Sequence, residues 1–321
     1  MKKNITILDS YVANPGDLSW EKFEALGNLT LYDRTTPSET FERMKDSEII
    51  FTNKTIITNE HLDNCPKLEW IGVLATGYNV VDVAYARQKG ITVTNIPAYS
   101  TASVAQHIFA FLLNITNFVS PYAQKVSNGE WATSKDFCMV DYNLMELADK
   151  TFGIIGFGTI GMTVAKLANS FGMKVMVYTP NPKREFECDT LTFVDLETLL
   201  RQSDVVSLHC LLSEETKGII NKGTLAKMKN TAILLNTARG PLIVEDDLAE
   251  ALNSEVIYAA ALDVLSSEPP NKNNPLFNAR NCYITPHVAW RTVEARIRML
   301  DIAYENIRSY LEDGVTKNAV N

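Results

Sequence analysis

The stretch Lys150-Thr-Phe-Gly-Ile-Ile-Gly-Phe-Gly-Thr-Ile-Gly161 decides how this chain folds. Its apolar residues 151–155 predict a buried strand, and the glycines that follow predict a tight turn leading into a helix. Gly156 permits the turn, Gly158 lets the backbone approach a pyrophosphate, and Gly161 lets the helix pack closely on the strand. The spacing of these glycines is that of a dinucleotide-binding loop.

The glycine spacing alone is weak evidence for nucleotide binding, because glycine turns without a ligand are common. The flanking residues strengthen it. Residues 162–171 form an amphipathic helical pattern, and residues 174–178 form a second strand at the distance typical of a β-α-β unit. The helix would present free N–H groups and the positive end of its dipole to a phosphate. We therefore favour a nucleotide-binding turn over a turn with no ligand.

The composition narrows the class of protein. A length of 321 residues allows two domains, and a net charge of −8 argues against a nucleic-acid or anionic-membrane partner. The first apolar run is too short for a signal peptide, and no apolar run approaches membrane-spanning length. The five cysteines are far apart without a CxxC pair, so we expect reduced thiols, no metal site and a cytoplasmic protein.

Short β-rich segments alternate with helical patterns along the chain, which predicts an α/β fold with parallel sheets covered by helices on both faces. The expected strands are residues 5–8, 29–32, 48–52, 70–74, 91–94, 152–155, 174–178, 205–208, 232–236, 258–263 and 282–285. The expected shorter helices are residues 18–26, 38–44, 80–89, 195–202, 224–228 and 245–253.

Two longer helical patterns predict where the chain passes between domains. Residues 103–119 repeat apolar side chains every three to four positions, and Pro121 is expected to end that helix. A last helix is expected over residues 292–312, with Gly314 as its stop. We expect two doubly wound parallel-sheet domains. A discontinuous, flavodoxin-like substrate domain would comprise residues 1–101 and 289–321, and a Rossmann-type dinucleotide-binding domain residues 102–288.

Three polar residues, Arg239, Glu268 and His287, each follow a predicted strand. Ligands bind at the carboxyl ends of the strands in a doubly wound sheet, so we expect the three side chains at one crevice. Histidine can give or take a proton near neutral pH, a neighbouring carboxylate stabilises imidazolium, and arginine grips a carboxylate with two hydrogen bonds. Singly, each is more often an ordinary loop residue. Jointly, with a nicotinamide on the glycine loop, they support hydride transfer to a 2-oxo acid with the histidine protonating its carbonyl oxygen.

The other three histidines are weaker candidates. His61 and His107 lie in helical patterns, where we interpret them as structural or solvated. His209 directly follows the strand at residues 205–208, so it would either touch the nucleotide or simply pack.

Five motifs resemble those of the D-isomer-specific 2-hydroxyacid dehydrogenases, in the order of that family and over nearly the whole chain. They are residues 156–161, 208–216, 236–240, 261–269 and 285–287. The resemblance implies that Arg239 orients the substrate, His287 is the acid and base, and Glu268 is its partner. It also implies a substrate-carboxylate loop and a set of cofactor contacts. The loop is Ala75, Thr76 and Gly77; the cofactor contacts are Val104 against the nicotinamide ring, Asp263 at its carboxamide, and Gly156, Gly158, Thr159, Ile160, Gly161, Thr179, His209, Cys210, Thr216, Thr237 and Ala238.

Within the family, residues 75–82 and 95–106 are most similar to the glycerate dehydrogenases, also called hydroxypyruvate reductases. The resemblance implies reversible NAD(P)-dependent reduction of hydroxypyruvate to D-glycerate. Other substrates, such as glyoxylate or lactate, stay open. Further alternatives are a non-catalytic NAD(H)-sensing protein of the corepressor type and an enzyme of the same superfamily that oxidises formate or phosphite. The joint presence of arginine, glutamate and histidine favours the reductase.

The residue after the strand at 174–178 does not decide between NAD and NADP. Many family members carry an aspartate there for the ribose 2′-hydroxyl, whereas this chain has Thr179, with Lys183 and Arg184 nearby. These cations would either pair with a 2′-phosphate or stay solvated, so NAD is favoured and NADP is the alternative. The family is typically dimeric through the crossing-helix region, and the apolar residues 137–142 fit a homodimer.

Overall fold

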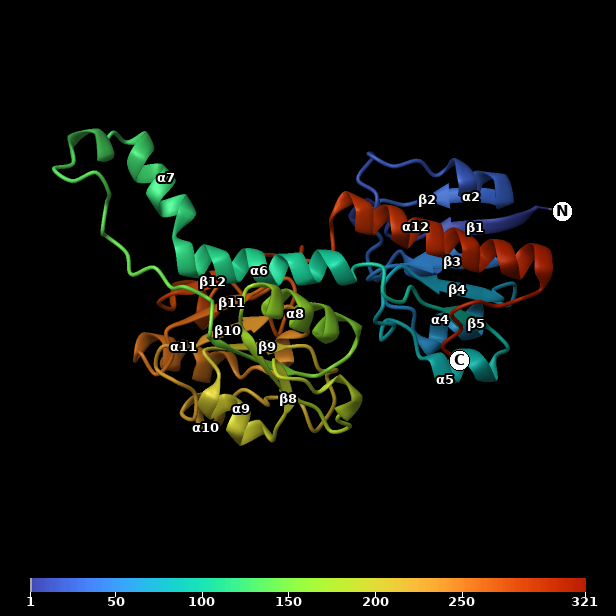
Figure 1. The fold of residues 1–321 in the computed structure, drawn as a ribbon. Helices are drawn as coiled ribbons and strands as arrows, with labels where there is room; N and C mark the ends of the chain where they lie inside the picture. The colour runs from blue at the N-terminus through green and yellow to red at the C-terminus, as the bar shows by residue number, and fades with distance from the viewer. Residues whose placement is uncertain (1) are drawn as a thin grey trace. The chain divides into compact units, whose positions relative to one another are not determined.

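The computed structural model describes residues 2–321 and divides into two compact units. One unit contains both ends of the chain, up to Ser100 and from Arg291 onward, and the other runs from Thr101 to Trp290 (Figure 1). Each unit contains one parallel sheet with helices, so the predicted fold class is confirmed.

The first unit has a five-stranded sheet in the order β2-β1-β3-β4-β5, with every neighbouring pair parallel. This is the strand order of flavodoxin-like folds. The strands are β1 (Lys3–Ile7), β2 (Gly27–Leu31), β3 (Ile49–Thr52), β4 (Trp70–Val73) and β5 (Thr92–Thr94). The helices are α1 (Ser10–Ala13), α2 (Glu21–Leu26), α3 (Thr40–Met44), α4 (Asn59–Asn64), α5 (Val83–Gln88) and α12 (Val293–Arg308).

The C-terminal helix α12 is held in the first unit by a buried charge. The guanidinium of Arg296 is almost fully buried and donates to both carboxylate oxygens of Asp17, at 2.7 and 2.6 Å. A two-pronged arginine–carboxylate pair fixes orientation as well as distance. It therefore ties the end of the chain to its beginning.

The second unit has a seven-stranded parallel sheet in the order β12-β11-β10-β9-β6-β7-β8. Its strands are β6 (Thr151–Ile155), β7 (Lys174–Tyr178), β8 (Leu191–Phe193), β9 (Val205–Leu208), β10 (Ile233–Asn236), β11 (Ala259–Leu262) and β12 (Cys282–Ile284). Its helices are α6 (Thr101–Asn117), α7 (Val119–Ser127), α8 (Thr159–Ser170), α9 (Leu196–Gln202), α10 (Lys222–Leu225) and α11 (Glu245–Asn253).

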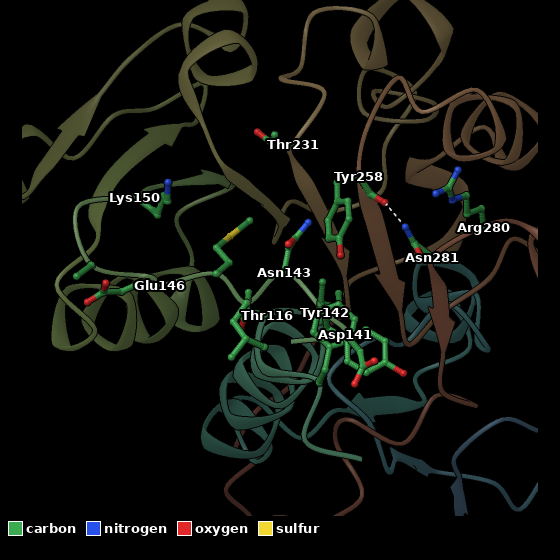
Figure 2. A pocket seen from close by; sticks show the side chains of 15 residues that line it. Thr116, Asp141, Tyr142, Asn143, Glu146, Lys150, Thr231, Tyr258, Arg280 and Asn281 are labelled. Carbon is green, nitrogen blue, oxygen red and sulfur yellow. Dashed lines mark hydrogen bonds between the residues drawn. The ribbon is translucent and has the colours of Figure 1, made fainter. Parts of the chain in front are cut away.

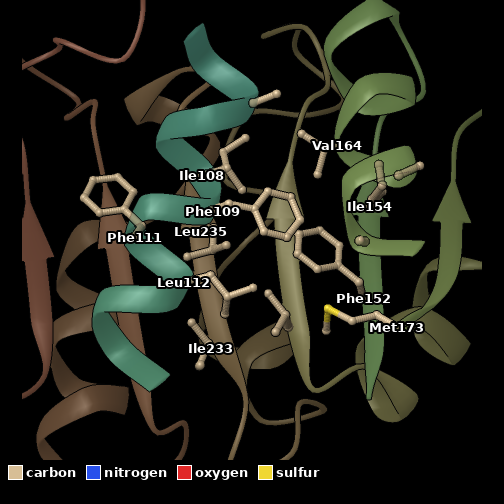
Figure 3. Packing of buried hydrophobic residues seen from close by; sticks show 14 of the residues in the cluster. Ile108, Phe109, Phe111, Leu112, Phe152, Ile154, Val164, Met173, Ile233 and Leu235 are labelled. Atoms are coloured by element: carbon tan, nitrogen blue, oxygen red, sulfur yellow. The ribbon is translucent and has the colours of Figure 1, made fainter. Parts of the chain in front are cut away.

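Helix α6 covers one face of this sheet, and Figure 3 shows its apolar side chains packed on β6 and β10. Ile108 and Leu112 are one turn apart on its buried side and are fully buried. The ring of Phe109 stacks on that of Phe152 from β6, with 5.9 Å between centroids. The predicted apolar repeat of α6 is therefore the face that joins helix to sheet.

The predicted end of this helix was wrong. α6 ends at Asn117, and Phe118 adopts a left-handed conformation with φ of 50°. A separate helix, α7, then begins at Val119 and contains Pro121 in its first turn, where the missing N–H of proline is harmless. Proline thus starts a helix here instead of stopping one.

Other differences concern short or terminal elements. The edge strand β8 was not predicted, because it is short and has little apolar periodicity, and the bounds of α4 were not predicted beyond the helical pattern around His61. Helix α12 ends at Arg308 and continues as a π-helical turn, Ser309–Asp313. Gly314 closes this turn with φ of 66°, as the sequence predicted.

Helix α7 and the irregular segment after it extend away from the body of their unit (Figure 1). We call residues 119–146 the arm. Across residues 2–321, no individual helix meets the length and hydropathy expected of a membrane span; α6 and α7 meet them only as a pair, bent by 56°.

Candidate active site

The glycine loop joins β6 to α8, and its glycines serve different contacts. Gly156 has φ of 97°, and a Cβ there would lie 2.5 Å from the backbone nitrogen of Cys210. A Cβ on Gly161 would lie 2.4 Å from the carbonyl oxygen of Gly156. Both glycines are therefore required by the protein's own backbone.

Gly158 differs, because nothing lies within 4 Å of the position where its Cβ would be. It is the N-cap of α8, and no side chain caps the first N–H groups of this helix, which includes Thr159 and Ile160. A bare helix start beside open space is a site for an anion. The loop thus fits the pyrophosphate of a dinucleotide on its own geometry.

The loop that follows β9 lies against this turn, because a Cβ on Gly156 would meet the backbone of His209 and Cys210. His209 accepts or donates a hydrogen bond at 2.9 Å with the hydroxyl of Ser207, and burial lowers the pKa of His209 to about 3. Burial also raises the pKa of the Cys210 thiol, so both side chains are neutral near pH 7. The hydroxyl of Thr216 donates to the carbonyl of Leu211 at 2.6 Å and closes the following loop.

The turn after β10 is fixed by Asn236, whose side chain sequence analysis did not single out. Its amide oxygen accepts from the N–H of Ala238 at 2.9 Å, and its amide nitrogen donates to the carbonyl of Arg239 at 2.9 Å. The buried hydroxyl of Thr237 has no hydrogen-bond partner among the described residues. A buried hydroxyl without a partner, on a residue that the family resemblance assigns to the cofactor, fits a hydrogen bond to that cofactor.

Arg239 is exposed, and its guanidinium donates to the carbonyl of Ala238 at 2.7 Å. The next residue, Gly240, lies so close to the β11 loop that a Cβ there would come within 2.0 Å of the carbonyl oxygen of Leu265. The arginine turn therefore packs directly on the loop that leads to Glu268.

Glu268 and His287 form a hydrogen-bonded pair. Nδ1 of His287 lies 2.6 Å from Oε2 of Glu268, and the other carboxylate oxygen accepts from the N–H of Leu265 at 3.2 Å. Both side chains are about one-third exposed. Because Nδ1 faces the carboxylate, Nε2 is the nitrogen left to meet a substrate.

Asp263 follows β11 and is almost fully buried. Its carboxylate accepts from the hydroxyl of Thr285 at 2.6 Å and from the backbone N–H groups of Val288 and Ala289, at 2.9 and 2.8 Å. It therefore fastens the loop after β12, which carries His287, to the end of β11.

The order of the strands places several of the predicted residues at one end of the sheet. Arg239, Asp263, Glu268 and His287 follow the carboxyl ends of β10, β11 and β12, which are neighbours in the sheet. Val104 is buried on α6, and Thr179 directly follows β7.

Ala75, Thr76 and Gly77 belong to the first unit, after β4. The hydroxyl of Thr76 donates to the carbonyl of Ile96 at 2.9 Å, and the N–H of Ile96 donates to Ala75 at 3.0 Å. This loop is thus anchored to the chain that follows β5.

A cavity of the second unit lies at the other end of its sheet. It has a volume of about 800 Å³, and Figure 2 shows Lys150, Thr231, Tyr258 and Asn281 around it. These residues precede β6, β10, β11 and β12, so the cavity is at the amino ends of the strands. None of the described residues that line this cavity is a predicted site residue.

Two further residues lie beside the His287 loop: His107, which was expected to be structural or solvated, and Thr285, which was named only within the motif at residues 285–287. Thr285 and His107 both join the Asp263 network, with 3.0 Å between Nε2 of His107 and Oγ1 of Thr285. His107 lies three positions after Val104 on α6, and that spacing was a usable signal because such residues share a helix face. His61, by contrast, caps the start of α4 through Thr58 and is structural.

Comparison with known proteins agrees with this geometry. Residues 109–289 match the family model described as "D-isomer specific 2-hydroxyacid dehydrogenase, NAD binding domain". The chain is 49% identical over 320 residues to a hydroxypyruvate reductase of Blautia hydrogenotrophica, covering 99% of each chain. It is 41% identical to a glycerate dehydrogenase of Methylorubrum extorquens, covering 100% of this chain and 99% of the other.

Among solved structures, an acyclic imino acid reductase (Bsp5) in complex with NADPH and D-Arg is similar with a TM-score of 0.85. The two are 31% identical, and the match covers 99% of this chain and 100% of the other. The strand order, the glycine loop and these similarities agree: the chain belongs to the D-isomer specific 2-hydroxyacid dehydrogenase family.

Proposed function

We propose that this protein reduces hydroxypyruvate to D-glycerate, reversibly, with a nicotinamide cofactor. The observation that carries the proposal is the Glu268–His287 pair, 2.6 Å apart, on the loops next to the Arg239 turn. The similarity to a hydroxypyruvate reductase and a glycerate dehydrogenase over nearly the whole chain supports this choice of substrate.

Each side chain has a task in this reaction. Arg239 would grip the substrate carboxylate and orient the carbonyl, because guanidinium presents two parallel donors. His287 would give its Nε2 proton to the carbonyl oxygen, while Glu268 stabilises the imidazolium form and fixes the ring. When bound, the reduced nicotinamide supplies the hydride. The residues that would hold it are the glycine loop, Val104, Asp263 and the loops after β7, β9 and β10.

We also propose a division of labour between the units. The second unit would bind the dinucleotide, since it contains the glycine loop and the matched family region. The first unit would contribute the backbone of Ala75, Thr76 and Gly77 to the substrate carboxylate, in keeping with the family resemblance.

A panel of 2-oxo acids assayed in parallel with NADH and NADPH tests this function. Hydroxypyruvate is expected to give the highest kcat/KM, followed by glyoxylate, because glyoxylate reductases are among the similar proteins, at 36% identity. Loss of reduced-cofactor absorbance with none of the acids would contradict the enzyme and favour an NAD(H)-sensing protein.

The cofactor proposal concerns the residues after β7. We propose that NAD is preferred and NADP is also used, because Thr179 has no charge to repel a 2′-phosphate. Arg184 is paired with Glu187, with 3.1 Å between Nη1 and Oε1. Lys183 is exposed and, within residues 2–321, has no salt-bridge partner. Lys183→Ala is expected to raise the KM for NADPH several-fold and leave that for NADH unchanged.

We further propose a homodimer formed through the arm. Its apolar side chains lack cover in the single chain: Phe137 is 90% exposed and Val140 is 86% exposed. Large exposed apolar side chains on one projecting segment mark a protein interface. Light scattering is expected to give twice the mass of 35.8 kDa for the wild type and a smaller mass for Phe137→Asp with Val140→Asp. Ile56→Asp, at a separate exposed apolar site, is the control.

The proposed location is the cytoplasm. All five cysteines are free thiols, and free thiols fit a reducing compartment.

A further inference from the structure

A hydrogen-bonded chain runs from α6 into the network around Asp263. Nε2 of His107 lies 3.0 Å from Oγ1 of Thr285, and that hydroxyl lies 2.6 Å from Oδ1 of Asp263. The His107 side chain is 21% exposed, and its ring meets the edge of Phe111 at 4.5 Å between centroids. The ring is therefore held in place from two sides.

The number of available protons shows which group donates in each of these two hydrogen bonds. A threonine hydroxyl has one proton to donate, and at 2.6 Å that proton goes to the carboxylate of Asp263. His107 must then be the donor to Thr285, through a proton on Nε2. Burial lowers the pKa of His107 although the Asp263 charge opposes this, so near pH 7 the ring is neutral with its proton on Nε2.

The network ends on a backbone segment that needs support. His287 has φ of 54°, a left-handed conformation that non-glycine residues seldom adopt. Its N–H donates to the carbonyl of Asp263 at 2.8 Å, and the next two N–H groups donate to the Asp263 carboxylate. The carboxylate must therefore keep one orientation to hold the turn, and the hydroxyl of Thr285 is its third donor.

We propose that His107 and Thr285 are positioning residues: they fix the carboxylate of Asp263, which holds the left-handed turn that presents His287. The inference rests on the proposed reductase function for its kinetic readout. It assigns a role to α6 beyond packing, because the helix that carries Val104 also aligns the proton donor.

Two matched pairs of variants test the proposal by kinetics. Thr285→Val keeps the shape and loses the hydroxyl, while Thr285→Ser keeps the hydroxyl. His107→Phe keeps an aromatic ring and loses the donor, while His107→Gln keeps an N–H near the same place. We expect Thr285→Val to lower kcat about tenfold and His107→Phe about fivefold, with the dissociation constant of NADH within about twofold of wild type. Each conservative variant is expected to restore kcat to within about twofold.

Equal kcat for Thr285→Val and Thr285→Ser, or a rise in the NADH dissociation constant that matches the fall in kcat, would overturn the proposal. Thermal unfolding of every variant checks that the fold is kept. If Thr285→Val does not fold, the His107 pair and the spectroscopic test below decide.

The second readout is independent of turnover. The chain has four histidines, so nitrogen-15 spectra of labelled histidine contain four ring systems, which single substitutions can assign. We expect His107 to show the Nε2–H tautomer at pH 7 and to lose it in Thr285→Val. An Nδ1–H tautomer would refute the chain of donors even in an active enzyme. A wild type that reduces no 2-oxo acid but shows the expected tautomer would refute only the proposed function.

Discussion

The two ends of the seven-stranded sheet differ in how their polar groups are arranged. At the carboxyl ends of the strands, Asp263 alone accepts three hydrogen bonds, and His287 is paired with Glu268. At the amino ends, Tyr258 and its neighbours line an open cavity of about 800 Å³ (Figure 2). At the carboxyl ends, hydrogen bonds within the protein fix the polar side chains. At the amino ends, the polar side chains surround open space.

The proposed function places the chemistry at the preorganised end of the sheet and not at the open cavity. Proton transfer requires donors held within a fraction of an ångström, which a hydrogen-bonded network supplies and an open cavity does not. In an open parallel sheet, ligands bind beside the loops that follow the carboxyl ends of the strands, and the network lies in these loops. The following experiments ask how far that contrast holds.

The largest effect is expected at His287, the proposed proton donor. His287→Ala should lower kcat about 10³-fold, because it removes general acid catalysis, while NADH binding stays nearly intact. Stopped-flow turnover and NADH fluorescence titration measure the two quantities. His61→Asn, in the cap of α4, is the matched control. Full activity of His287→Ala with hydroxypyruvate would place the chemistry elsewhere.

The next effect concerns the glycine loop. Gly158→Ala should raise the NADH dissociation constant about tenfold with little change in melting temperature, because its new methyl group meets no protein atom and enters the cofactor space. Gly161→Ala should lower the melting temperature, since its methyl group would collide with the Gly156 backbone. Comparable melting temperatures for the two variants would show that the loop is not built as described.

A smaller effect is expected for His209 as the pH falls. Its pKa is about 3 in the folded protein and near 6.5 when unfolded, so the unfolded chain binds the extra proton. The stabilising contribution is complete above pH 6.5 and is lost progressively down to about pH 3, by at most about 1.4 kcal/mol per pH unit. His209→Asn should therefore show a shallower loss of unfolding free energy between pH 6 and pH 4 in urea titrations. Parallel curves for the two proteins would contradict the assignment.

The smallest effect is expected at the amino end. Tyr258→Phe and Lys150→Met should keep kcat/KM for hydroxypyruvate within about twofold of wild type, because their cavity lies at the opposite end of the strands. Steady-state kinetics suffice. A tenfold fall in either variant would break the contrast between the two ends.

Much of the architecture was predictable from local pattern. Apolar strands and the glycine spacing identified β6, the following turn and α8, since each depends on residues close in sequence. The end of α6 was not predictable in this way, because Phe118 takes a left-handed conformation that no proline or glycine signals. The formation of short elements such as β8 depends on residues that are close in space, so the local sequence has no clear strand pattern there.

The candidate site divides along the same line. Arg239, Glu268 and His287 were predicted because each follows a strand. The hydrogen bonds of Thr285 were not predicted because its partners are distant in sequence: His107 is 178 positions away and Asp263 is 22 away. Pairing across such separations is visible only in the fold.

The close approach at Gly240 has a consequence for altering the substrate range. No side chain can be added there without displacing the backbone of Leu265 and Ser266. Residues 236–240 and residues 265–268 therefore form one structural unit. A designer who exchanges loops with a relative should transplant residues 236–240 and 265–268 together, since either half alone would meet a mismatched neighbour.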